Sequence, residues 1–221
     1  MTRPEQHPPA FVVAATLAGH LFRMMRTAKL MSLSASNAKG VAARAGDKAL
    51  GFRPITDFIA EMANDTIHYA TKINHLALTV SRTAVNDLRA LDATQRFAEA
   101  RDQMASAEQA AFIDHLIHQT DKERAAMHTE TAEIMTQLNT QLDEIHQRVR
   151  GSTIIVSNSR TEASRAGEFQ KYLDSIANSV ELAARDIQLE ISKCRKLIES
   201  LATLDDCNKN IPDYRLRTGI S

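Results

Sequence analysis

Apolar side chains recur every three or four positions along most of this chain, which is the spacing of one buried face on an α-helix. The first such stretch runs from about Pro9 to Ala45. Its apolar positions are Phe11, Ala14, Ala15, Leu17, Leu21, Met24, Met25, Ala28 and Leu33. Gly46 and Gly51 then interrupt the pattern, and Pro54 suits the first turn of a following helix, where a missing N–H is not needed. The pattern predicts a long helix and a tight turn into a second one.

The second helical stretch continues to about Leu91 without glycine. Its apolar positions are Ile55, Ile59, Met62, Ala63, Ile67, Ala70, Ile73, Leu76, Leu78 and Val80. Two places beyond it have the spacing of a capping box, Asp92 with Gln95 and Ser106 with Gln109. The sequence therefore predicts that the chain turns back between 92 and 108, without selecting one residue.

Two further helices follow the same spacing. The third extends towards Gly167 with Gly151 as its weak point, and its apolar positions are Phe112, Leu116, Met127, Ile134, Leu138, Leu142, Ile145, Val149, Ile154 and Ile155. The fourth extends from Glu168 to about Leu204, with Phe169, Leu173, Ile176, Val180, Ala183, Ile187, Ile191, Leu197, Ile198 and Leu201.

This order of elements predicts an all-α fold of long antiparallel coiled-coil hairpins that form a four-helix bundle. The expected organisation is a disordered leader over 1–9, a first helical hairpin over 10–91, a second over 92–204, and an irregular tail over 205–221. The hairpins either pack within one chain or exchange between two copies, because long hairpins are prone to domain swapping. A homodimer is therefore one expected state.

Composition narrows the function classes. The 221 residues include only 7 glycines and 5 prolines, and 27 basic residues balance 27 acidic ones. Because acidic and basic residues are interspersed, we expect no basic surface that would bind nucleic acid. The apolar run from Phe11 to Phe22 is too short for a membrane span, and the first residues lack a secretory signal. We expect a cytoplasmic protein with reduced thiols at Cys194 and Cys207.

A repeat becomes visible at the two predicted glycine turns. The segment A-A-R-A-G-D at 42–47 matches A-S-R-A-G-E at 163–168, and Asn37 matches Asn158 upstream. Downstream, Phe52, Asp57, Ile59 and Ala60 match Phe169, Asp174, Ile176 and Ala177. The second copy lacks four residues between its acid and its phenylalanine, which is about one helical turn. Its bend is therefore expected to be tighter or shifted.

These residues resemble the cytoplasmic signalling tip of methyl-accepting chemotaxis receptors, with its asparagine, E-A-A-R-A-G-E segment, short glycine loop and G-F. The resemblance covers about thirty to fifty residues around each turn. It implies a non-catalytic module, without cofactor or metal, that binds a chemotaxis histidine kinase and its coupling protein, or neighbouring receptors. The implied binding residues are Asn158, Glu162, Arg165, Gly167, Glu168 and Phe169 in the second copy, and Asn37, Arg44, Gly46, Asp47, Phe52 and Ile55 in the first.

The chain also departs from the family pattern. Val41 stands in place of the tip glutamate, and Ser36 and Ser157 each replace an apolar contact residue. Phe58 and Ala60 replace the usual E-x-R after the first turn. The first tip is therefore expected to have lost part of the partner surface, which favours a divergent receptor-like module over a functioning receptor.

Each proposed contact has a plainer interpretation. The glycines are needed for the turns in any case. Arg44 and Arg165 pair equally well with carboxylates of the same chain or of a partner. Phe52, Ile55 and Phe169 form either an apolar docking patch or part of the core.

Three other functions remain open at this point. Asp65 with His68 and Asp143 with His146 have the spacing of a di-iron ligand pair, but that motif uses glutamate. His115 and His118 alone make a weak metal site. Glu108 and Gln109 lie in a segment faintly like a receptor methylation site. A purely structural coiled-coil spacer or dimerisation module is the main alternative.

Overall fold

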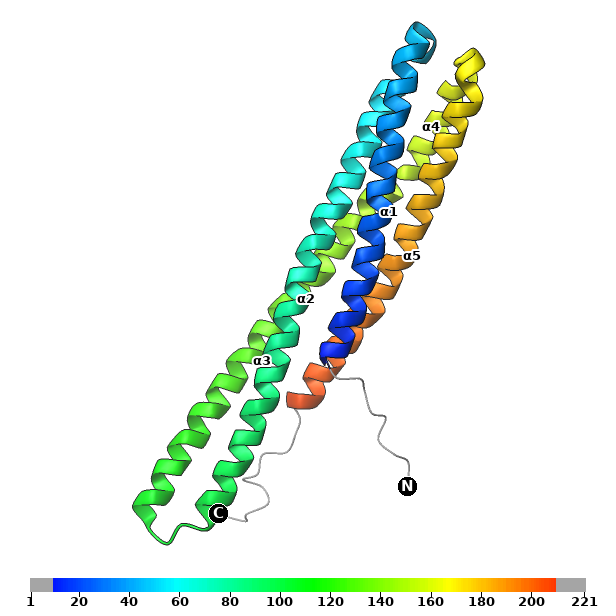
Figure 1. The fold of residues 1–221 in the computed structure, drawn as a ribbon. Helices are drawn as coiled ribbons and strands as arrows, with labels where there is room; N and C mark the ends of the chain where they lie inside the picture. The colour runs from blue at the N-terminus through cyan, green and yellow to red at the C-terminus, as the bar shows by residue number, and fades with distance from the viewer. Residues whose placement is uncertain (1–9, 210–221) are drawn as a thin grey trace, which may run out of the picture. The chain divides into compact units, whose positions relative to one another are not determined.

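A computed structural model describes residues 10–209, with side chains described up to 203. Every regular element in this range is helical. Five α-helices follow in order: α1 (Ala10–Ala45), α2 (Phe52–Asp102), α3 (Ala107–Arg150), α4 (Ser152–Arg165) and α5 (Gln170–Lys209). Two short 3-10 helices, η1 (Gly46–Ala49) and η2 (Gly167–Phe169), form the bends between α1 and α2 and between α4 and α5 (Figure 1). The all-α prediction is confirmed.

The return turn lies within the predicted interval and coincides with one of the two capping-box sequences. The chain leaves α2 after Asp102 and enters α3 at Ala107, directly after Ser106. Ser106 accepts a backbone hydrogen bond from Ala110, as expected at the start of a helix. Asp92 and Gln95 lie inside α2. There, Asp92 forms an ion pair with Arg96 on the next helical turn.

Two boundaries differ from the prediction. The third predicted helix is divided at Gly151 into α3 and α4, where the sequence placed a weak point. The last helix continues to Lys209, so residues 205–209 are helical rather than irregular. The chain has no glycine or proline there to stop the helix before Pro212. The predicted leader over 1–9, the rest of the tail and the side chain of Cys207 lie outside the described residues.

The chain folds as two compact units that do not coincide with the two predicted hairpins. Unit 2 contains 16–75 and 138–196, and therefore both glycine turns. Unit 1 contains 76–137, together with the described residues of 1–15 and 197–221. Each predicted hairpin, 10–91 and 92–204, contributes to both units.

Unit 2 has a continuous apolar core made by one face of each helix. Its largest fully buried side chains are Leu17, Leu21, Met24, Met31, Phe52, Ile59, Met62, Ile73, Leu138, Leu142, Ile145 and Leu173. Burial of such side chains is the main stabilising contribution, at roughly 1.5–3 kcal/mol for each.

Ion pairs connect the helices of unit 2 around this core. Lys39 on α1 pairs with Asp57 on α2 at 2.8 Å, and Arg148 on α3 pairs with Asp65 on α2 at 3.2 Å. Arg195 on α5 contacts Asp143 on α3 at 2.5 Å. These contacts join α1 to α2, α2 to α3 and α3 to α5.

Unit 1 contains the turn between α2 and α3 and a smaller core that includes Ala77, Val80, Ile134 and Met135. Arg101 near the end of α2 pairs with Asp114 near the start of α3, with 2.6 Å between Nε and Oδ1. No helix in the described range is both long enough and apolar enough to cross a membrane.

Candidate functional site

The two glycine turns have the same backbone conformation at matching positions of the repeat. Gly46 and Gly167 both have φ of 59°, which is left-handed backbone that a side chain disfavours. They are the only residues of the described range with positive φ. Each glycine is the first residue of a 3-10 turn that follows a helix, α1 for Gly46 and α4 for Gly167. In the second turn Ala166 donates its N–H to the carbonyl of Ala163 at 2.9 Å, which satisfies one of the free carbonyl groups at the end of α4.

Burial repeats along with the sequence before each turn. Ala35, Ala38, Ala42 and Ala45 are buried on α1, and Val156, Ser159, Ala163 and Ala166 occupy the matching buried positions on α4. Small residues dominate both sets, so the helices approach closely near the turns. The repeat therefore describes two helix ends with the same core-facing side and the same bend.

The turns belong to one unit and contact each other. Both lie at the same end of unit 2 (Figure 1), and α4 packs against η1. The carboxylate of Glu162 covers Gly51, in the space that a Cβ atom on Gly51 would occupy. The Oε1 atom of Glu162 accepts a hydrogen bond from Arg165 at 3.2 Å. The tip glutamate of the second copy thus packs on the loop glycine of the first.

A shallow groove opens beside this contact. It has a volume of about 360 Å³ and lies between the start of α2 and the outer face of α4. We call it the tip groove. Its lining residues are Gly51, Pro54, Ile55, Phe58, Ile155, Asn158, Thr161 and Glu162. Three of them, Ile55, Asn158 and Glu162, were singled out from the sequence as binding residues.

The remaining predicted residues divide by exposure. Exposed side chains, or exposed backbone for glycine, are found at Asn37, Arg44, Asp47, Arg165, Gly167 and Glu168. Gly46 and Phe169 are partly exposed. Phe52 has no exposed surface, and Ile55 is only 7% exposed. These two residues therefore belong to the apolar core, and Ile55 also lines the floor of the tip groove.

No family model, curated protein or solved structure matches this chain.

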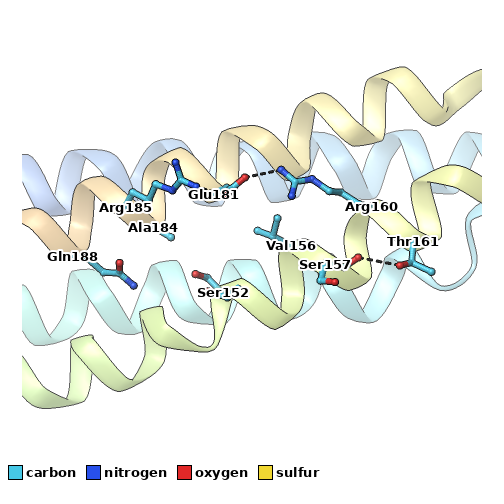
Figure 2. Close-up of a pocket in the computed structure, with 10 residues that line it drawn as sticks. Ser152, Val156, Ser157, Arg160, Thr161, Glu181, Ala184, Arg185 and Gln188 are labelled. Carbon is cyan, nitrogen blue, oxygen red and sulfur yellow. Dashed lines mark hydrogen bonds and ion pairs between the residues drawn. The ribbon is translucent and has the colours of Figure 1, made fainter.

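A second groove of about 470 Å³ runs between α4 and α5 and was not expected from the sequence. Figure 2 shows Arg160 of α4 reaching towards Glu181 of α5, with 2.6 Å between Nη2 and Oε2. Arg185 contacts the other oxygen of Glu181 at 2.6 Å. The hydrogen bond from Arg160, followed by the positive charges of both arginines, lowers the pKa of Glu181 although partial burial opposes it. The contact could be found from sequence only once the register of the second hairpin is known.

An ionic cluster around the buried Glu190 links α1 to α5 farther from the turns. The Oε2 atom of Glu190 lies 2.6 Å from Nδ1 of His20 and 3.2 Å from Nε of Arg23, and its Oε1 atom accepts a hydrogen bond from Lys193 at 2.8 Å. Burial by itself raises the pKa of Glu190, but the hydrogen bonds from Lys193, His20 and Arg23 outweigh it and lower the pKa to about 2. The sequence signal is a glutamate among the apolar positions of the last helix.

Cys194 lies one helical turn after Glu190 and is fully buried. Burial, aided by the negative charge of Glu190, raises the pKa of the thiol to about 12. The thiol is free, as predicted, and is protonated at neutral pH.

Unit 1 has a buried charge of its own. Asp87 on α2 has a side chain only 5% exposed, and its Oδ1 accepts a hydrogen bond from Nε of Arg124 on α3 at 2.9 Å. His128 lies 3.4 Å from the same oxygen. The second oxygen of Asp87 is buried without a hydrogen-bond partner. Asp87 lies seven residues after the buried Val80 and so continues the buried face of α2, but the face predicted from the sequence followed apolar residues only and did not include it.

The candidate metal ligands are used in other contacts. Asp65 and Asp143 pair with Arg148 and Arg195, respectively. Within the described residues, no three histidine, cysteine, aspartate or glutamate side chains are grouped so that they could hold a metal ion. Glu108 and Gln109 lie exposed in the first turn of α3.

Proposed function

We propose that this chain is a non-catalytic, chemoreceptor-like signalling or scaffold protein whose hairpin tips bind chemotaxis array components. The partners are the histidine kinase, the coupling protein or chemoreceptors, and the protein acts in the cytoplasm. In this proposal the helices of unit 2 form a four-helix bundle of antiparallel coiled-coil hairpins, in which one chain supplies both tips.

One observation carries the proposal. The two copies of the A-[AS]-R-A-G-[DE] segment share the same left-handed glycine, at φ of 59° in both, and the turns they form contact each other within one unit. A spacer needs glycine turns, but it has no need of the same polar residues around both of them. The exposure of Arg44 beside the first turn and of Arg165 and Glu168 beside the second supports a role in contacts with other molecules.

The experiment is a binding titration of the full chain against a purified coupling protein and, separately, a chemotaxis histidine kinase. The variants Arg165→Ala and Glu168→Ala remove exposed charges at the second turn. We expect each variant to weaken binding at least fivefold. A charged hydrogen bond at an interface typically contributes about 1 kcal/mol or more, which corresponds to that change in affinity.

Arg26→Ala is the matched control, because Arg26 is an exposed arginine of α1 in the same unit but lies far along the helix from the turn. Its affinity should equal that of the wild type. Helicity and thermal stability are measured for all variants. Absence of binding by the wild type to both proteins, and to a purified chemoreceptor signalling domain, would contradict the proposal.

A structural spacer or dimerisation module is the second candidate. It is favoured by large apolar side chains that unit 1 leaves exposed, with 45% exposure at Leu78, 52% at Leu88 and 63% at Phe112. This function predicts self-association without binding to any array component. Sedimentation velocity of the wild type and of Phe112→Ser, alongside the titration, separates the two functions.

A further inference from the structure

The tip groove combines an apolar floor with a single charge. Ile55, Phe58 and Ile155 supply the apolar surface, and the ring of Phe58 reaches the place where Gly151 lacks a side chain, with 3.6 Å from its Cζ to a Cβ built there. Of the eight lining residues, only Glu162 carries a formal charge. The groove therefore complements an apolar side chain that has a cation beside it.

The position of Glu162 leaves part of its carboxylate available. Its side chain is 25% exposed, and its Oε1 atom is bound by Arg165, whose own side chain is 69% exposed. The Oε2 atom lies over Gly51 at the edge of the groove. A lysine or arginine of a partner at the edge of the groove would meet the exposed part of this side chain. Asn158, also exposed at the rim, adds a hydrogen-bonding amide.

The repeat provides an internal comparison, because every groove residue outside the deleted turn has a counterpart in the other copy. Ile155 corresponds to Ser34, and Glu162 corresponds to Val41, which is buried at 2% exposure. Phe58 corresponds to Ser175. Of the residues that line the groove, only Asn158 has the same residue type in the other copy, at Asn37.

The glycine that receives Glu162 has no counterpart at all. Gly51 lies among the four residues that are missing from the second turn. A glutamate at position 41 would therefore have no loop glycine to cover. The valine at 41 and the shorter second turn thus agree with each other. The counterpart surface has serines in place of Phe58 and Ile155 and Tyr172 in place of Ile55, and it has neither the acid nor the loop.

We infer that each chain carries one partner-binding site, the tip groove, which takes an apolar side chain flanked by a lysine or arginine, and that the counterpart surface of the repeat binds no partner. This inference rests on the proposed function and specifies its stoichiometry and chemistry. One chain binds one copy of its partner despite having two similar turns.

Isothermal titration of the full chain with a purified coupling protein, and in parallel with the kinase, tests this. The expected stoichiometry is one partner per chain, whether or not the chain dimerises. The double variant Phe58→Ser with Ile155→Ser gives the groove the residues of its counterpart, and should lower the affinity at least tenfold. Glu162→Gln keeps the shape but removes the charge, so it should lower the affinity several-fold and reduce its dependence on salt.

The matched controls lie on the counterpart surface. Ser34→Ala and Ser175→Ala should each leave the affinity within twofold of the wild type. Circular dichroism and melting temperature verify that each variant is folded. If the groove variant fails to fold, Glu162→Gln and the measured stoichiometry still decide the question, because neither depends on the apolar floor being changed.

The outcomes are distinct. One partner per chain, with affinity lost in the groove variants only, supports the inference. Two partners per chain, or affinity lost in the counterpart variants, overturns it while the proposed function stands. Absence of binding by the wild type to the coupling protein, the kinase and a purified chemoreceptor signalling domain overturns the proposed function, and this inference with it.

Discussion

The carboxylate of Glu162 occupies the space where Gly51 would carry a Cβ atom, which joins the second hairpin to the loop of the first. The backbone of Gly51 lies outside the left-handed region, so alanine is compatible with its conformation. The lack of a side chain at Gly51 therefore leaves room for the carboxylate of a residue more than a hundred positions away.

Gly51→Ala is expected to displace the Glu162 carboxylate. Because a glutamate side chain is flexible, the cost should be small, about 1 kcal/mol in free energy of unfolding. In a Glu162→Ala background the same change should cost nothing. Urea denaturation of the four proteins in this double-mutant cycle measures the coupling. Equal costs in both backgrounds would show that the two residues do not interact.

The left-handed glycines behave differently. Gly46→Ala and Gly167→Ala force a Cβ atom into backbone at φ of 59°, and each should destabilise the protein by about 1–2 kcal/mol. Gly40→Ala is the control, because Gly40 lies within α1 with open space around it. That change should instead stabilise the protein by about 0.5–1 kcal/mol. Thermal unfolding followed by circular dichroism measures these changes. If Gly40→Ala destabilised the protein as much as Gly46→Ala, the difference between helical and left-handed glycines would be refuted.

The buried Asp87 of unit 1 should be far more sensitive than a surface acid on the same helix. Asp87→Ala leaves Arg124, whose side chain is 15% exposed, without its buried carboxylate. The expected loss is about 3 kcal/mol. Asp92→Ala removes an exposed partner from Arg96 and should cost less than about 0.5 kcal/mol. Chemical denaturation compares the two variants, and similar losses would contradict the assignment of Asp87 as a structural charge.

Glu190 gives a pH dependence with a defined sign. Its pKa in the folded protein is about 2, below the ordinary value of 4.5, so the unfolded chain binds a proton first as the pH falls. The stabilisation by Glu190 is therefore complete above about pH 4.5 and is lost between pH 4.5 and pH 2. Glu190→Gln should be less stable than the wild type at pH 7, by up to about 3 kcal/mol.

The measurement for Glu190 is urea denaturation of both proteins at pH 7, 5 and 3. The stability difference should be the same at pH 7 and pH 5 and smaller at pH 3. Glu199→Gln serves as a control for the loss of one acidic group from α5. A difference that stays constant down to pH 3 would contradict the low pKa.

Much of the fold followed from apolar spacing. The first helix, the glycine turns and the interval of the return turn were predicted because long helices with one apolar face leave regular traces in sequence. The end of the last helix was placed too early, because its polar residues 205–209 gave no apolar period to follow. The division into two units could not be predicted, because both units share the same continuous helices.

The site was predicted less completely, for a physical reason. The resemblance to a receptor tip singled out Glu162, Asn158 and Ile55 as binding residues, but not Phe58 or Ile155. Their grouping depends on the register between hairpins that are far apart in sequence. The same limitation concealed the contacts of Glu190 with His20 and Arg23, which come from α1. Local patterns show which residues share a helix face, whereas register decides which faces meet.

The missing helical turn in the second copy has a consequence for assembly. A receptor-like module with two equivalent faces can connect neighbours on both sides and extend a lattice. A chain with only one partner-binding face can join the lattice through that face but cannot bind a second neighbour. Under the inference made above, this protein would act as a terminator that limits how far an array grows.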